Sequence, residues 1–98
     1  MYRHGSYDEK LSKKLKNQKF AKIFLLTLME GDEGLSLLEA LKHSIKRMGI
    51  KEFSGISKIP EKSISRMLGS KKLPKIETLN KYCTPFGLKV YLDLEDVA

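Results

Sequence analysis

Five polar residues between positions 61 and 66 could recognise another molecule by hydrogen bonding. Each can bond to a base edge or to a phosphate: Glu61, Lys62, Ser63, Ser65 and Arg66. A guanidinium such as that of Arg66 can bind guanine through two hydrogen bonds, and a carboxylate such as that of Glu61 can accept from the amino group of cytosine. Ile64 and Met67 are spaced three apart and would lie on the buried side of one helix. The pattern indicates a helix that contacts nucleic acid with its polar side, although any solvated helix also has such a side.

The overall charge favours an anionic partner. The 98 residues carry a formal net charge of +7, which points first to nucleic acid. Residues 1–30 and 60–89 are basic, whereas the tail 90–98 contains three acidic residues and no basic one.

Residues for catalysis or metal binding are sparse. The chain has two separated histidines, a single cysteine at Cys83 and no glycine-rich phosphate loop, so we predict no catalytic residue, metal site or cofactor, and no enzyme. A lone cysteine forms no internal disulfide, and the only long apolar run, 23–29, is too short to span a bilayer. We therefore expect a cytoplasmic protein with no membrane partner.

The elements that would position these residues are mostly helical. Apolar residues at intervals of three and four predict a short helix around Leu11 and Leu15, followed by helices over about 18–30, 36–48, 51–57, 60–68 and 74–84. Asn17 is a predicted N-cap, and Ser36 with Glu39 has the spacing of a capping box.

The period changes after Gly87. Leu88, Val90, Leu92 and Leu94 alternate with polar or aromatic residues, which predicts a half-buried strand. A lone strand has two unpaired edges, so we expect it to pair with a second copy or with a partner protein. The predicted fold class is all-α, with five to six short helices and one C-terminal β-strand that pairs in a dimer. We divide the chain into a helical extension, 1–34, for dimer or partner contact, and a DNA-binding domain with the strand, 35–98.

Residues 51–68 have the order that a helix-turn-helix requires. A short helix with a small residue, Ser54, would be followed by a turn pinned by Ile59 and by the second helix. Residues 37–92 resemble the phage-repressor-like (XRE/Cro-type) helix-turn-helix domain, and residues 11–90 are similar to the HigA-like addiction-module antidotes, or antitoxins. The matching features, by order and spacing, are Met29–Asp32, Leu38–Leu41, Met48–Ile50, Pro74, Thr78, Leu79 and Phe86–Leu88.

The resemblance implies a homodimeric antitoxin of a type II toxin–antitoxin module. Such a protein binds double-stranded DNA at its own promoter and neutralises a RelE/ParE-like toxin. It implies base-proximal roles for Glu61, Lys62, Ser63, Ser65 and Arg66, and phosphate contacts from Lys51, Ser70, Lys71 and Lys72. The chain departs from the pattern where Lys58 replaces the usual turn glycine, where Ile59 would be the N-cap, and where Pro85 interrupts the last helix.

Two other functions fit the sequence. One is a free-standing XRE-type regulator without a toxin, and the other is a protein-interaction module that uses the fold as a scaffold. The role of the N-terminal lysine cluster also stays open between a solvated face, contact with an acidic patch on a toxin, and contact with DNA: Lys10, Lys13, Lys14, Lys16, Lys19 and Lys22. The apolar stripe 20–29 could serve as core, dimer contact or toxin surface.

Overall fold

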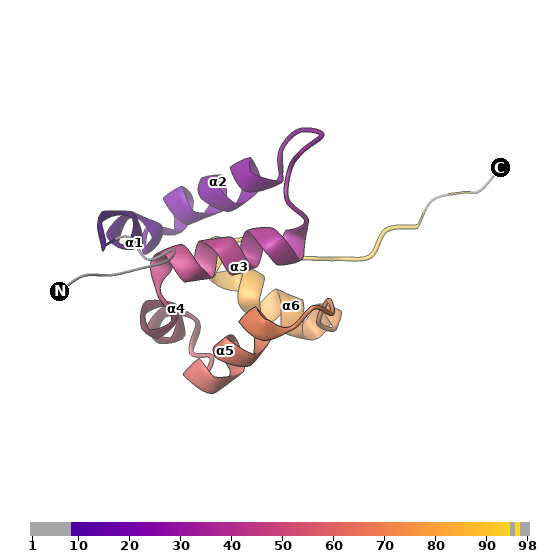
Figure 1. Cartoon of the computed structure of the whole chain (residues 1–98). Helices are drawn as coiled ribbons and strands as arrows, with labels where there is room; N and C mark the ends of the chain where they lie inside the picture. The colour runs from indigo at the N-terminus through magenta and orange to yellow at the C-terminus, as the bar shows by residue number, and fades with distance from the viewer. Residues whose placement is uncertain (1–8, 95, 97–98) are drawn as a thin grey trace.

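Six α-helices and one short 3-10 helix make up the described part of the chain, residues 9–94 and 96 of a computed structural model (Figure 1). In order they are α1 (Glu9–Leu15), α2 (Gln18–Met29), α3 (Leu37–Met48), α4 (Ile50–Ser57), α5 (Glu61–Gly69), α6 (Ile76–Cys83) and η1 (Thr84–Phe86). The predicted helical class with five to six short helices is confirmed for these residues. Residues 1–8 of the predicted extension and 95, 97 and 98 of the predicted strand-bearing domain lie outside them.

Side-chain caps start two of the helices as predicted. The Asn17 side chain accepts a hydrogen bond from the Phe20 amide at 3.1 Å, and the Ser36 hydroxyl accepts from the Glu39 amide at 3.2 Å. Each bond satisfies one of the amides that a helix leaves free at its N-terminus. The predicted start of α5 was wrong by one residue. Pro60, with ψ of 144°, is the N-cap in place of Ile59.

Helix α3 lies at the centre of the molecule. Its buried residues Leu41 and Ile45 have no exposed surface. In Figure 1, α1 and α2 lie on one side of α3, and α4, α5 and α6 lie on the other. The Ser12 hydroxyl on α1 donates to the Met48 carbonyl at the end of α3, which joins α1 to the central helix across 36 residues of sequence. One hydrophobic cluster therefore includes residues from both layers.

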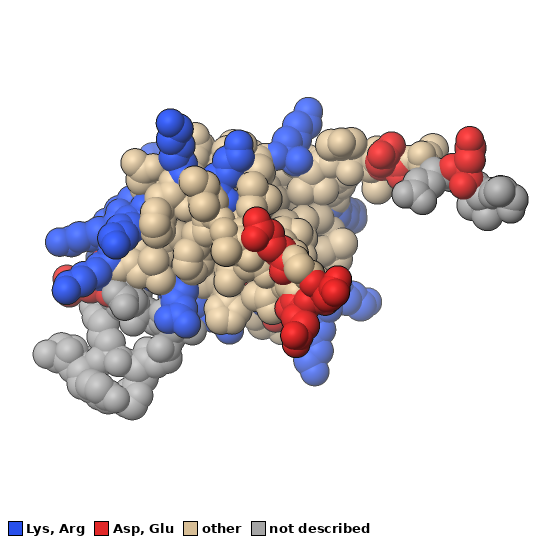
Figure 2. Space-filling view, turned by 90° about the horizontal axis from the view of Figure 1, so that it is seen from above, with Lys and Arg blue, Asp and Glu red and all other residues tan. Residues whose placement is uncertain are grey.

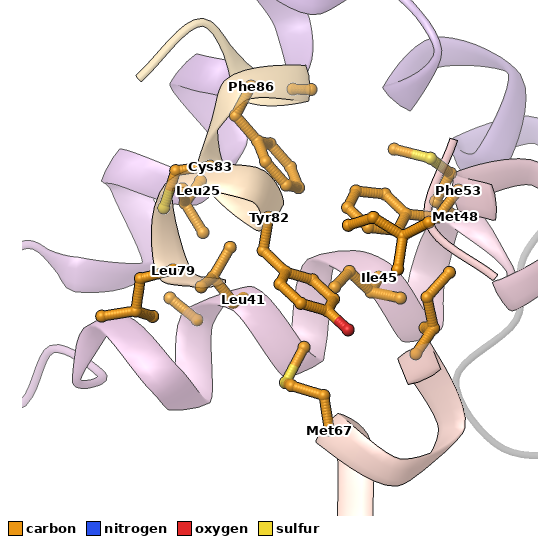
Figure 3. Close-up of a cluster of buried hydrophobic side chains, with 14 of the residues drawn as sticks. Leu25, Leu41, Ile45, Met48, Phe53, Met67, Leu79, Tyr82, Cys83 and Phe86 are labelled. Carbon is orange, nitrogen blue, oxygen red and sulfur yellow. The ribbon is translucent and has the colours of Figure 1, made fainter. Parts of the chain in front are cut away.

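Three aromatic rings in contact, one pair stacked and one tilted, form the part of the core that holds α4 in place. The ring of Phe53 lies 6.0 Å from that of Tyr82 and 5.9 Å from that of Phe86, and Figure 3 shows them converging from α4, α6 and η1. Pro85 ends the regular helix, as predicted, but the chain continues as η1. This extra turn brings Phe86 into the core with no exposed surface.

The predicted C-terminal strand was wrong for the residues described. Residues 88–94 form no regular element, and they leave the body as an extended trace (Figure 1). Alternation showed which side chains turn inward, since Leu88 and Val90 pack on the core. A strand also needs a backbone partner. Here the Leu88 amide donates to the Cys83 carbonyl at 3.2 Å, and the backbone of Val90 is bonded by a side chain. The amide of Asn80 accepts from the Val90 N–H at 2.6 Å and donates to its carbonyl at 3.1 Å.

The connection between α4 and α5 turns through a left-handed residue. Lys58 has φ of +67°, which confirms the strained backbone expected where a lysine replaces glycine. The Ser54 hydroxyl donates to the Ile59 carbonyl at 2.6 Å, and the Ser57 hydroxyl accepts from the Ile59 amide at 3.1 Å. These bonds fix the direction in which α5 leaves the turn, while the Ile59 side chain is buried.

Replacing Lys58 with glycine should stabilise the fold. A non-glycine residue in the left-handed region costs about 1–2 kcal/mol, and the greater flexibility of glycine in the unfolded chain offsets part of this gain. We expect Lys58→Gly to raise the free energy of unfolding by about 1 kcal/mol in urea denaturation. Lys58→Ala is the matched control, because it removes the same side chain but keeps the strain. Equal changes in the two variants would show that the turn stores no strain.

Candidate nucleic-acid interface

The exposed side of α5 gathers four of the five residues predicted to lie near bases. Glu61, Lys62, Ser65 and Arg66 are all exposed, while Ile64 and Met67 on the opposite side are buried. None of the four makes a hydrogen bond or an ion pair with another described residue. Their donors and acceptors are therefore free to bond to an external partner.

Ser63 is separated from these four. At about 100° per residue it falls on the flank of α5. It is half-buried there, and it lines two clefts together with Thr78 and Tyr82 of α6. The structure therefore directs this hydroxyl towards α6, whereas the sequence analysis grouped it with the base-proximal residues.

The loop after α5 is fixed from two sides. The Ser70 hydroxyl accepts from the Lys72 amide at 3.2 Å and donates to its carbonyl at 3.3 Å, and the ammonium of Lys42 on α3 donates to the Ser70 carbonyl. The hydroxyl predicted to touch a phosphate thus shapes the turn. Lys71 and Lys72 are exposed in this loop, as are Leu73 and Lys75.

Lys51 is exposed in the first turn of α4. In Figure 1, α4 lies on one side of α5 and the loop that contains Lys71 and Lys72 lies on the other. The predicted phosphate-binding lysines therefore flank the exposed side of α5. No ion pair joins any two of the residues that the structure describes, so no such pair with a carboxylate competes for these ammonium groups.

Tyr82 of α6 is not among the predicted site residues, but it lies beside α5. Its side chain is 4% exposed, and its phenol oxygen points towards Met67 (Figure 3). It lines both clefts beside α5, which have volumes of about 560 and 300 Å³. The cations at these clefts are Lys58, Lys81, Arg66 and Lys72, and no carboxylate lines either one. The sequence could not predict that Tyr82 lines these clefts, because residues of both α5 and α6 form them and the sequence does not show which helices lie side by side.

Burial keeps the two ionisable core groups neutral. Desolvation raises the pKa of the Tyr82 phenol, and the positive charge of Arg66 acts against this by lowering it. Desolvation also raises the pKa of the Cys83 thiol. A reactive cysteine needs a lowered pKa, so the structure gives Cys83 the properties of a packing residue.

Residues 9–94 and 96 contain neither a cluster of metal ligands nor a membrane-spanning helix. No group of three or more His, Cys, Asp and Glu side chains comes together there to hold a metal ion, and none of the helices is long and apolar enough to cross a bilayer. Comparisons with protein-family models, with curated proteins and with solved structures find no match for this chain. A functional proposal therefore depends on the residues themselves.

The raised pKa values predict that alkaline pH destabilises the protein. Stability from Cys83 and Tyr82 is fully present below their unfolded pKa values, near the ordinary 9.0 and 10.0, and is lost as the pH rises through the higher folded values. We expect the free energy of unfolding to fall above about pH 9, and to fall less steeply in Cys83→Ala. The exposed Tyr91→Phe is the control and should leave the profile unchanged. A Cys83→Ala profile parallel to the wild type would contradict the role of the thiol.

Proposed function

We propose that α4 and α5 form a helix-turn-helix, and that α5 binds in the major groove of double-stranded DNA. The observation that carries this proposal is the exposed side of α5, where Glu61, Lys62, Ser65 and Arg66 lie together without hydrogen bonds to described residues. The buried side holds Ile64 and Met67 in the core, so the helix has a fixed orientation.

The dimensions and charges suit a DNA groove. A helix with its side chains is about 10–12 Å across, which fits the roughly 12 Å width of the major groove, and the nine residues of α5 extend about 13 Å along its axis. Arg66 would bind guanine and Glu61 would accept from cytosine, which supplies sequence preference. Lys51 and the pair Lys71 and Lys72 would bind phosphates on the two sides of the groove, which supplies affinity without sequence preference.

We further propose that the protein is the antitoxin of a type II toxin–antitoxin module. Its resemblance to the HigA-like antidotes extends over residues 11–90, and this supports a homodimer that represses its own promoter and neutralises a RelE/ParE-like toxin. The proposed helix-turn-helix, α4 and α5, lies among helices α3–α6, and α1 and α2 form a further layer outside this group. A two-fold dimer would bind a palindromic operator with half-sites about 34 Å apart.

DNA binding can be tested with two classes of variant in fluorescence titrations on the upstream DNA. Lys71→Ala with Lys72→Ala should weaken binding to every sequence and reduce the slope of log K against log salt by about 1.8, because two phosphate contacts are lost. Arg66→Ala should instead cost about 1–3 kcal/mol on the operator and reduce its preference over unrelated DNA. Lys46→Ala with Lys89→Ala removes the same charge from exposed positions outside α5 and its flanking loop, and is the matched control.

The outcomes separate the candidate interface from general charge effects. If the control reduces the salt slope as much as the loop variant does, binding depends on net charge alone, and the proposal that DNA binds at α5 and its flanking loop is wrong. If Lys62→Glu with Arg66→Glu leaves the biological activity intact, the fold acts as a scaffold for protein interaction.

The antitoxin proposal is tested by co-expression with the adjacent open reading frame. We expect a stable complex in a pull-down, recovery of growth when the neighbour is toxic alone, and a shift of the promoter fragment by the complex. A promoter shift by this protein alone, with no partner recovered, would identify a free-standing regulator and overturn the antitoxin proposal.

A further inference from the structure

Helix α2 has an apolar surface that the rest of the described chain does not cover. Ile23 is 64% exposed, Leu26 is 41% exposed and Phe20 is 36% exposed. The rings of Phe20 and Phe24 stack with centroids 6.3 Å apart, so this side of the helix is already ordered. Apolar residues this exposed in one helix are typical of a contact surface.

Lysines border this surface. Lys19 lies one turn before Ile23, and Lys22 lies one turn before Leu26, so both ammonium groups flank the apolar residues. We call Lys19, Phe20, Lys22, Ile23 and Leu26 the α2 face. At its N-terminal end a depression is lined by Lys14, Asn17, Lys19 and Phe20. Figure 2 shows lysines gathered at one end of an uncharged area and a group of acidic side chains at its other end.

The tail, residues 91–96, has the complementary composition. Tyr91, Leu92 and Leu94 are 74%, 83% and 95% exposed, the most exposed large apolar side chains among the described residues. Asp93, Glu95 and Asp96 give this segment three negative charges and no positive one. The Asn80 side chain anchors the chain at Val90, and beyond that point residues 91–94 run away from the body (Figure 1).

We propose that the tail of one copy binds the α2 face of a second copy, reciprocally, to form a dimer. Leu92 and Leu94 are about 7 Å apart in an extended chain, which fits within the roughly 9 Å that separate Phe20 and Leu26 along α2. The leucines, on one side of the extended tail, would cover the apolar residues, and Asp96, on the same side, would lie near the lysines of the α2 face, while Asp93 adds negative charge to the tail from its other side. Two surfaces left exposed in one copy are thereby buried together.

Charge favours this arrangement over the pairing of two tails. Two identical tails side by side would bring six carboxylates together, and like charges on opposed strands are destabilising. The α2 face contains two lysines and no acidic residue. Because the tail is anchored on α6 and directed outward, a second copy is the occupant to which we commit.

Charge exchange tests the proposal in solution without DNA. Sedimentation equilibrium at about 100 mM salt should show a dimer for the full-length wild type. Asp93→Lys with Asp96→Lys, and separately Lys19→Glu with Lys22→Glu, should each weaken association at least tenfold. A 1:1 mixture of these two variants should recover the dimer, because each tail then faces an α2 surface of opposite charge. Lys46→Glu with Lys75→Glu, at exposed positions outside the α2 face and the tail, is the matched control and should remain dimeric.

Each alternative gives a different result. A tail that folds back on its own α2 would give monomers throughout, and the proposal fails. Pairing between tails would leave the Lys19→Glu, Lys22→Glu variant dimeric, which also overturns it. A mixture that stays monomeric while both variants keep the wild-type circular dichroism spectrum would show that the two surfaces do not meet. Since the assay contains no DNA and no toxin, its result is independent of the proposed function.

Discussion

The packing of Phe53 against Tyr82 and Phe86 is the interaction on which the candidate interface depends. Isolated helices of eight and nine residues, such as α4 and α5, are not stable in water, so tertiary contacts must hold them. Phe53 is the one fully buried residue of α4, and it fixes that helix against α6 and η1. The turn bonds at Ser54 and Ser57 then transmit this position to α5. A change at Phe53 would therefore displace the exposed side of α5 although the two do not touch.

Charge is the second constraint, and it acts against the fold. A net charge of +7 with no ion pair between described residues produces self-repulsion that the core must offset. The cationic groups that line the loop and clefts beside α5 are Lys58, Arg66, Lys72 and Lys81. Repulsion among these cations lowers the stability of the isolated domain, and bound phosphates would reduce this repulsion. The excess of lysine on α1 and α2 has acidic counterparts in Glu30, Asp32 and Glu33 after α2 and in the tail.

The sequence was a good guide wherever the determinant was local. Asn17 and Ser36 cap helices through residues three positions away, and the left-handed turn at Lys58 follows from one departure in a known pattern. It was a poor guide where the determinant was a neighbour in space. Alternation in residues 88–94 could not show what would accept their hydrogen bonds, and the answer for Val90 is a side chain on α6. The flank position of Ser63 was predictable from helical geometry, whereas the cleft beside Tyr82 requires the packing of two helices.

The central helix α3 keeps the two proposed interfaces apart. The α2 face lies on one side of α3, and α5 lies on the other, so a dimer formed through the α2 face and the tails would leave both copies of α5 exposed. The two are still connected through α6. This helix anchors the tail at Asn80, and two residues later it places Tyr82 between the core and the clefts beside α5. Association of two copies through the tail would therefore act on the helix that carries Tyr82, a residue that lines the clefts beside α5.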